Sequence, residues 1–379
     1  MMEIPRYGSG ALADVVPSLL AGLDVPGAVN VLGVPAARRV CLLLVDGLGW
    51  ELLRAHTDTA PFLASLAGPP ITAGFPSSTA TSIAALGTGL PTGEHGLVGY
   101  TFDTGDQLLN ALGWNHHGAP EHTDLRATFV PEEAQPRPTA FTRAAEAGVT
   151  VRVVAPHQQK GSGLSRAVLR GAPFHPVYAL GDLVSGALDA LRSADRVFCY
   201  AYHADLDALG HLFGPGTEPW LLQLSYLDQV AASLAARLPA DAMLVVVADH
   251  GMVTLGEEDR VDFDTTPALQ DGVRLLGGEP RVRHVYTEPG AADDVLAAWR
   301  EVLGDTAWTL TRDEATTLGL FGPTVAPHVL PRIGDLVVAS RGTHAVIRTA
   351  VEPLISGFSG QHGSLTTAEQ HVPLLTFQP

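Results

Sequence analysis

Residues 38–46, RRVCLLLVD, form an almost unbroken apolar run that stops at an aspartate, which a glycine follows. A run of this kind is typical of a central parallel strand that is buried on both faces. Similar apolar segments occur at 149–156, 195–202, 242–248 and 372–377, and helical patterns separate most of them. The alternation predicts an α/β fold with three layers, α/β/α, around a mostly parallel central sheet.

The pattern of predicted strands and helices changes between residues 261 and 322. This segment holds a strand-like RVRHVYTE at 281–288, an amphipathic AADDVLAAWREVL at 291–303 and a strand-plus-helix pattern at 308–320. We expect a small α+β insertion over residues 261–322, placed like a cap over the active-site face. Residues 1–260 and 323–379 would then form the catalytic core, to which the buried strand GDLVVAS at 334–340 returns. A chain of 379 residues with 46% hydrophobic residues can fill one large core of this kind.

The charge balance restricts the partners. Lys and Arg number 23 against 40 Asp and Glu, a formal net charge of -17. Such a surface repels nucleic-acid polymers and anionic membranes at long range, so we expect neither as a partner. If the substrate is anionic, bound divalent cations are the obvious means of reversing the local field.

The two cysteines and the N-terminus suggest an intracellular protein. Cys41 and Cys199 each lie in a run that resembles a buried strand, and no disulfide framework is evident. The first residues lack a basic stretch followed by an apolar segment, and no run of about 18 apolar residues occurs later. The predicted location is the cytoplasm.

Residues 75–89, FPSSTATSIAALGTG, combine a Pro-Ser-Ser turn with hydroxyl residues and then small apolar residues. We interpret the segment as a strand-to-helix turn that presents a hydroxyl at a helix N-terminus, where partial positive charge favours an anion. Thr79 is the preferred candidate, with Ser78 and Thr81 as rivals. A hydroxyl is a poor nucleophile at neutral pH and therefore needs an activator.

Six acidic and histidine residues are candidate ligands for that activator. Three of them, Asp46, Asp249 and His250, follow apolar runs directly, whereas Asp207 and His211 stand four apart on one face of a predicted helix. His362 lies in a glycine-rich loop. Each residue alone is explained by a helix cap or a core histidine, but together they suit two divalent ions about 4 Å apart, zinc first and manganese second. Such ions would activate the hydroxyl and stabilise the leaving oxygen.

The order of these motifs, VDG, the hydroxyl turn, DxxxH, ADHG and GxHG, resembles the alkaline phosphatase superfamily and, within it, the type I phosphodiesterase/nucleotide pyrophosphatase branch. The resemblance implies an alkaline phosphatase-like fold and a covalent phospho-threonine at Thr79. It also implies one metal site made by Asp46, Asp249, His250 and Thr79, and another made by Asp207, His211 and His362. Tyr100 stands where nucleotide-type members usually carry an asparagine, and its phenol could donate to a phosphoryl oxygen.

Residues 101–140 are polar and rich in proline and aromatic residues, and we interpret them as a long active-site loop. Trp114 and His116 in that loop, and Lys160 in the loop after another strand, are candidate substrate contacts. His117 is a further candidate in the same loop.

The predicted function is hydrolysis of a small phosphodiester or a nucleotide pyrophosphate-type substrate, because residues 75–100 contain no Lys or Arg to hold a dianionic monoester. Arg166, Arg170 or Lys160 could still reach the site, which leaves a phosphomonoesterase or a phosphonate hydrolase as alternatives. A metal-binding scaffold without catalysis is the alternative from another class.

Overall fold

Seven strands make up the central sheet of the computed structural model, which describes residues 1–66, 68–105, 107–119 and 123–379. In spatial order they are β2 (Pro70–Thr72), β18 (His371–Phe377), β9 (Ala242–Val247), β1 (Arg39–Val45), β8 (Val197–His203), β6 (Thr150–Pro156) and β7 (Phe174–Val177). Strand β18 runs antiparallel to both of its neighbours, and the other pairs in the sheet are parallel. The mostly parallel sheet that the apolar runs predicted is therefore confirmed.

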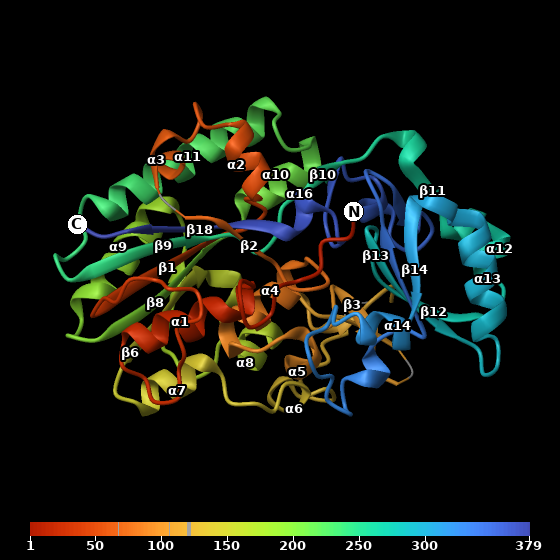
Figure 1. Ribbon diagram of the computed structural model, residues 1–379, viewed down its shortest axis with the longest axis horizontal. Helices are drawn as coiled ribbons and strands as arrows, with labels where there is room; N and C mark the ends of the chain where they lie inside the picture. The colour runs from red at the N-terminus through yellow and green to blue at the C-terminus, as the bar shows by residue number, and fades with distance from the viewer. Residues whose placement is uncertain (67, 106, 120–122) are drawn as a thin grey trace.

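Helices cover both faces of this sheet (Figure 1). One layer contains α2 (Trp50–Ala55), α3 (Pro61–Ser65), α9 (Leu180–Arg192), α10 (Asp205–Phe213) and α11 (Glu218–Ala235). The other contains α1 (Val15–Gly22), α4 (Thr79–Thr88), α7 (Ala140–Glu146) and α8 (Gly163–Val168). Because every residue of β8 and β9 is buried, the strands need an apolar side chain at nearly every position, which is why they read as continuous runs. The three-layer α/β/α arrangement is confirmed.

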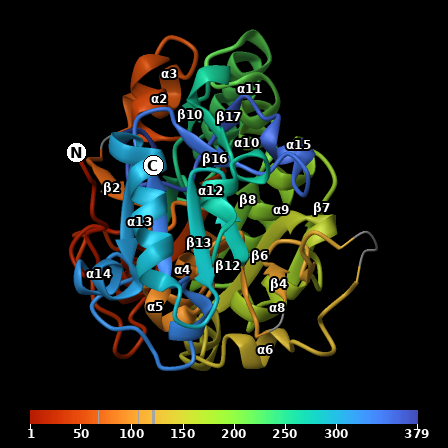
Figure 2. The ribbon, with the colours of Figure 1, turned by 90° about the vertical axis from the view of Figure 1, so that its right-hand side faces the viewer.

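A second, antiparallel sheet of four strands lies beside the core (Figure 1) and faces the viewer in Figure 2. Its order is β12 (Val273–Glu279), β13 (Val282–Thr287), β15 (Leu336–Ser340) and β14 (Ala307–Thr311). Helices α12 (Pro267–Gln270), α13 (Ala292–Leu303) and α14 (Arg312–Thr317) belong to the same part of the chain, and α13 buries Trp299 against an apolar cluster separate from the main core. The sheet extends beyond the expected range of 261–322, because β15 pairs with β13 and β14 rather than with the central sheet.

Two short pairings connect this region to the core. Strands β10 (Val253–Thr254) and β17 (Gly360–Gln361) are antiparallel, and β11 (Arg260–Asp262) and β16 (Ala345–Ile347) are parallel. The short helices α15 (Pro353–Ser356) and α16 (Thr367–Gln370) lie between β16 and β18 in the chain. Since both pairings join residues near 255 to residues near 350, the insertion is closed at its base.

The segment 101–140, expected to be a long irregular loop, contains regular structure instead. Its described part forms the three-stranded sheet of β3 (Thr101–Asp103), β4 (Leu108–Asn110) and β5 (Asn115–His116), followed by α6 (Pro131–Ala134); α5 (Thr92–His95) precedes it. Residues 106 and 120–122 of the segment lie outside the described part of the chain. The strands are only two or three residues long, which is too short for a period-two pattern to be recognised in the sequence.

Both cysteines are fully buried and free, and they pair in register across β1 and β8, as expected for small apolar packing. Within the described residues no helix has the length and the apolar character that crossing a bilayer requires.

A buried histidine joins the small sheet to the core and leads to a prediction on acid stability. Nδ1 of His284 accepts from the Gly334 amide at 3.2 Å, so its Nε2–H donates to the Val98 carbonyl at 2.8 Å. Burial lowers the pKa of His284 from 6.5 to about 4. Because the folded protein favours the neutral ring, the free energy of unfolding should fall as the pH drops from about 6.5 to about 4, by about 3 kcal/mol for this residue.

Urea unfolding of the metal-free protein between pH 4 and pH 8 measures this loss. In His284→Gln, which keeps an amide donor but cannot titrate, the dependence of unfolding free energy on pH should be shallower than in the wild type. Equal slopes in the wild type and in His284→Gln would contradict the assignment.

Candidate active site

The carboxyl end of β1 supplies the first acidic residue of the site. Asp46 follows β1 directly and is buried, and Gly47 after it has a positive φ of 75°. A Cβ on Gly47 would lie 3.0 Å from the Cα and the Cβ of Asp207, so a glycine at this position lets the end of β1 approach α10. The Gly47 amide also donates to Oδ1 of Asp249 at 3.0 Å, which fixes the end of β1 against the end of β9.

Three of the predicted ligands gather at this edge. Ligand atoms of Asp46, Asp249 and His250 all lie within 4.8 Å of one another, and Nε2 of His250 is 3.5 Å from Oδ1 of Asp46 and from Oδ2 of Asp249. These two carboxylate oxygens are buried and have no hydrogen-bond partner. Burial and the nearby Asp249 and Asp207 raise the pKa of Asp46 well above its usual value. The cluster therefore carries more negative charge than its own contacts compensate.

A second group forms around α10, which presents Asp207 and His211 on one face. Nε2 of His211 lies 3.3 Å from Oδ2 of Asp207, and its Nδ1 lies 2.8 Å from the Gly360 carbonyl. Ligand atoms of Asp207, His250 and His362 also lie within 4.8 Å of one another. His250 and His362 are stacked with ring centroids 3.5 Å apart, so the two groups are adjacent. The structure thus brings together all six predicted ligands.

The ionisable side chains of this second group shift one another's pKa values. Burial would raise the pKa of Asp207, but the imidazoles of His211 and His362 hold it below its usual value. For His211, burial lowers the pKa and Asp207 raises it, with a net rise to about 9. Burial and the nearby His250 lower the pKa of His362 well below its usual value. The ring is therefore neutral and has a nitrogen lone pair that can bind a metal ion.

Thr79 is the first residue of α4 and contacts His250, which belongs to both groups. Its Oγ1 is 3.2 Å from Nε2 of His250. The rival hydroxyls are directed elsewhere: Ser78 donates to Oε2 of Glu279 at 3.3 Å, and Thr81 donates to the Leu97 carbonyl at 3.0 Å. Among these three hydroxyls, only that of Thr79 contacts a predicted metal ligand.

The residues fit divalent cations. Oδ1 of Asp46, Oδ1 of Asp207 and Oδ2 of Asp249 are buried without a hydrogen-bond partner, and an unpaired buried carboxylate oxygen is costly. Three carboxylates and three imidazoles form the mixed oxygen and nitrogen donor set that zinc and manganese accept. A cation in each group would compensate the negative charge that raises the pKa of Asp46.

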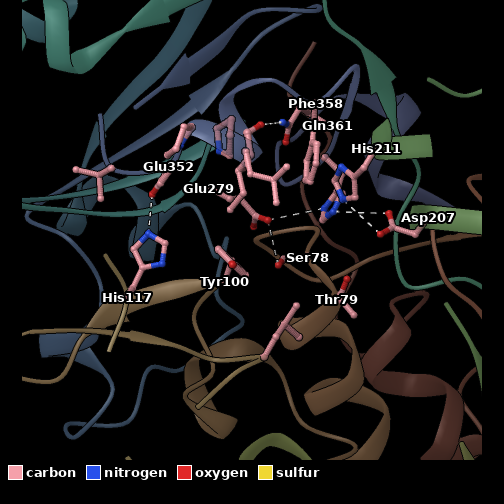
Figure 3. A pocket seen from close by; sticks show the side chains of 17 residues that line it. Ser78, Thr79, Tyr100, His117, Asp207, His211, Glu279, Glu352, Phe358 and Gln361 are labelled. Atoms are coloured by element: carbon pink, nitrogen blue, oxygen red, sulfur yellow. Dashed lines mark hydrogen bonds and ion pairs between the residues drawn. The ribbon is translucent and has the colours of Figure 1, made fainter. Parts of the chain in front are cut away.

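A cavity of about 450 Å³ opens beside Thr79, and sequence reasoning missed several residues that line it. Glu279, from the end of β12, is directed toward Ser78 and lies 3.9 Å from Nδ1 of His362 (Figure 3). Its Oε1 is buried without a partner, and burial raises its pKa to about 8. No motif surrounds Glu279 in the sequence, and its position depends on how the small sheet packs against the core.

A buried ion-pair network forms another part of the wall. Glu352 accepts from Arg283 at 2.8 Å and 3.2 Å. Its Oε1 lies 2.9 Å from Nε2 of His117 (Figure 3). Burial opposes the charge of Glu352, but Arg283 and His117 together outweigh burial and lower the pKa of Glu352 to about 2. Arg283, Glu352 and His117 come from three distant segments, and the sequence carries no signal that they meet.

Some of the predicted substrate contacts line the cavity beside Thr79, and others do not. Tyr100 lines the cavity and accepts a hydrogen bond from Nδ2 of Asn110 at 2.7 Å, which leaves its own proton for another acceptor. Trp114 is fully buried, and its indole donates to the Phe129 carbonyl at 2.8 Å, so it belongs to the core. His116 lies on β5 and Lys160 is exposed, and neither lines a cavity at Thr79, whereas His117 does.

The two arginines that could have reached the phosphate are engaged elsewhere. Arg166 forms a paired contact with Glu132 at 2.7 Å and 2.9 Å. Arg170 donates to backbone carbonyls, among them that of Gln135 at 2.9 Å. Across the described residues, neither cavity beside Thr79 is lined by Arg or Lys.

Comparison with known proteins gives the family and the fold. A family model described as type I phosphodiesterase / nucleotide pyrophosphatase matches residues 40–365. Murine ectonucleotide pyrophosphatase/phosphodiesterase 5 has a similar structure, with a TM-score of 0.69 at 17% identity over 90% of this chain and 88% of that one. An inactive threonine-to-alanine variant of the murine protein in complex with AMP gives a TM-score of 0.69 at 16% identity, again over 90% and 88%. The human counterpart gives 0.67 at 18% identity over the same shares. These structures confirm the predicted fold.

One curated relative is similar over a short segment. The catalytic subunit of human GPI ethanolamine phosphate transferase 3 is 42% identical over 57 residues, which are 15% of this chain. The match spans only 5% of that much longer protein.

Proposed function

The chain belongs to the type I phosphodiesterase/nucleotide pyrophosphatase family. From this premise we propose that it is a hydrolase, which acts on a small phosphodiester or nucleotide pyrophosphate-type substrate through a covalent phospho-threonine at Thr79. The observation that carries the proposal is the position of the Thr79 hydroxyl, 3.2 Å from Nε2 of His250. That nitrogen lies 3.5 Å from Oδ1 of Asp46 and from Oδ2 of Asp249, two buried carboxylate oxygens without hydrogen-bond partners. The inactive threonine-to-alanine variant of the murine neighbour is consistent with an essential threonine.

The proposed metal ligands are Asp46, Asp249 and His250 with Thr79 in one site, and Asp207, His211 and His362 in the other. Two divalent ions, zinc or else manganese, would supply Lewis-acid stabilisation of the phosphoryl, attacking and leaving oxygens.

In the proposed reaction, Oγ1 of Thr79 forms a bond to phosphorus while the bond from phosphorus to the leaving oxygen breaks. The proton of the Thr79 hydroxyl is balanced by protonation of the leaving oxygen, so the leaving group departs as an alcohol or a phosphate. Water then forms a bond to phosphorus while the bond from Oγ1 to phosphorus breaks, which releases a phosphomonoester, and one proton of the water regenerates the Thr79 hydroxyl. Tyr100 would donate its phenol proton to a non-bridging oxygen. Its position in the cavity wall and the hydrogen bond that its own oxygen accepts from Asn110 support this role.

The charge of the site favours a diester over a monoester. A monoester carries two negative charges at neutral pH, and neither cavity beside Thr79 offers an Arg or Lys from the described chain to hold the second. A diester carries one negative charge, and its second substituent can occupy space rather than require a cation.

A panel of substrates tests the proposed function. With the purified protein loaded with zinc or manganese, we expect kcat/KM for bis-p-nitrophenyl phosphate to exceed that for p-nitrophenyl phosphate by at least about 10-fold, roughly the effect of one charge-assisted hydrogen bond. A preference for the monoester would favour the phosphomonoesterase alternative, and preferred turnover of phosphonate monoesters would favour a phosphonate hydrolase. The absence of turnover with every ester, at full metal content, would support a metal-binding scaffold.

A further inference from the structure

Two imidazoles of the proposed metal site are oriented by backbone carbonyls. Nδ1 of His250 lies 3.0 Å from the Gly251 carbonyl oxygen, and Nδ1 of His362 lies 3.0 Å from the Ser77 carbonyl oxygen. Because a carbonyl only accepts hydrogen bonds, each neutral ring carries its proton on Nδ1 and keeps the lone pair of Nε2 for a metal ion. The positions of the two carbonyls therefore decide the direction of both ligands.

Glu369, a fully buried residue of α16, is bonded to both of the loops that carry these carbonyls. Its main-chain carbonyl accepts from the Gly251 amide at 2.9 Å. Its side-chain Oε1 accepts from the Ser364 amide at 3.0 Å, and the Ser364 carbonyl accepts from the Ser77 hydroxyl at 2.8 Å. One residue thus links the loop after His250 to the loop after His362 and to the turn before Thr79.

The contact between α16 and the loop after His250 is close. A Cβ on Gly251 would lie 1.9 Å from the Ala368 carbonyl oxygen, so the approach requires a residue without a side chain. Since the helix and the loop are in direct contact, a displacement of α16 would also displace the Gly251 carbonyl.

The carboxylate of Glu369 is itself held by Arg281, which lies between β12 and β13 of the small sheet. Nε and Nη2 of Arg281 donate to Oε1 and Oε2 at 2.9 Å and 2.7 Å, and both side chains are fully buried. A paired contact of this kind adds directional specificity to the attraction between the charges. Neither residue lines a cavity beside Thr79, so any effect on the reaction passes through other residues.

We propose that Glu369 is a positioning residue of the metal site. Through the two loops it sets the direction of Nε2 in His250 and His362, and Arg281 holds its carboxylate in the required orientation. The inference rests on the proposed function, because it concerns the ligands proposed there. A buried ion pair often stabilises a fold no better than apolar side chains of similar volume, so the hydrogen bonds that this pair directs are the better explanation of its presence.

Two double variants separate the hydrogen bond to the Ser364 amide from the charges of the pair. Arg281→Met with Glu369→Gln, the methionine–glutamine variant, removes both charges but keeps an oxygen that can accept from Ser364. Arg281→Met with Glu369→Met, the double-methionine variant, removes both charges and that acceptor at nearly the same side-chain volume. The methionine–glutamine variant is therefore the matched control for any loss of stability that follows removal of the ion pair.

Zinc titration of the metal-free full-length proteins measures the effect on the ligands. At least one zinc dissociation constant of the double-methionine variant should exceed that of the methionine–glutamine variant by at least about 10-fold, the usual effect of losing a residue that orients a metal ligand. At saturating zinc, kcat for bis-p-nitrophenyl phosphate should also be at least about 10-fold lower, because displaced ligands misplace the reacting groups. KM should be equal in the two variants. Equal zinc affinities would overturn the proposal and leave the pair with a role in folding alone.

Glu369→Asp keeps the proposal testable if the double-methionine variant does not fold. Its carboxylate still compensates the charge of Arg281 but is one methylene shorter, so it cannot hold Arg281 and the Ser364 amide in the present geometry. Zinc affinity should fall by about 3-fold relative to the wild type, roughly the loss of one hydrogen bond. Wild-type zinc affinity in Glu369→Asp would overturn the proposal.

The zinc titration also separates this inference from the proposed function. If the wild type binds two zinc ions but hydrolyses no ester, the proposed function fails, and the zinc affinities of the variants still decide the role of Glu369. If esters are hydrolysed and the two double variants bind zinc equally, the positioning role fails and the phosphodiesterase proposal stands. A wild type that binds no zinc or manganese would overturn both.

Discussion

Replacement of Thr79 by alanine is expected to lower kcat for a phosphodiester by at least about 10³-fold, because the replacement removes the oxygen that forms the covalent bond to phosphorus. Steady-state kinetics with bis-p-nitrophenyl phosphate measures the loss. Thr79→Ala leaves the carboxylates and imidazoles of both ligand groups in place, so metal analysis of the variant should still find bound ions. Retention of full turnover in Thr79→Ala would exclude Thr79 as the nucleophile.

The adjacent hydroxyl provides the matched control. Ser78 directs its hydroxyl to Glu279 rather than to a predicted metal ligand, so Ser78→Ala should retain most of the kcat that Thr79→Ala loses. Thr79→Ser keeps a hydroxyl and should recover part of the activity. With wild-type protein, rapid quenching during turnover should trap phosphate on the peptide that contains Thr79. Label on a peptide that holds another hydroxyl would assign the nucleophile elsewhere.

The features that could be predicted from the sequence are those with local causes. A strand buried on both faces needs an apolar side chain at almost every position, so β1, β8 and β9 were recognisable from short windows. Asp46 and Asp249 follow such strands directly, and parallel strands bring their carboxyl ends to one edge. The position of each aspartate after its strand, together with the parallel pairing of the strands, is therefore enough to predict that the two aspartates lie close together.

The residues that could not be predicted depend on long-range packing. Strand β15 has the same apolar run as a core strand, and only its antiparallel pairing with β13 and β14 assigns it to the small sheet. Glu279 and Glu352 look like ordinary acidic residues in the sequence and reach the cavity because this sheet and the following segment close over it. Trp114, expected at the substrate, instead fills the core, since an aromatic residue in an irregular segment gives no signal of its direction.

Removal of the metal ions is expected to abolish turnover and to destabilise the fold. Without cations, the buried oxygens Oδ1 of Asp46, Oδ1 of Asp207 and Oδ2 of Asp249 have no hydrogen-bond partner, and the carboxylates repel one another. Chelation should therefore lower kcat by at least about 10²-fold and reduce Tm by several degrees, since a ligand that binds only the folded state stabilises it. Elemental analysis should find two ions per chain, and zinc or manganese should restore both quantities.

Another buried aspartate, Asp228, provides a control that distinguishes loss of metal from a loss of fold stability that is unrelated to metal binding. Asp228 accepts from the amides of Leu63 and Phe62 at 2.8 Å and 3.2 Å, so its carboxylate supports the start of α3 instead of contacting a predicted metal ligand. Asp228→Asn should lower Tm while keeping two ions per chain. Asp249→Asn should reduce the metal content and kcat together, and zinc addition should raise its Tm less than it raises that of the wild type. If Asp249→Asn bound two ions with unchanged affinity, the pair of carboxylates at the ends of β1 and β9 would not be a metal site, and the unpartnered oxygens would need another explanation.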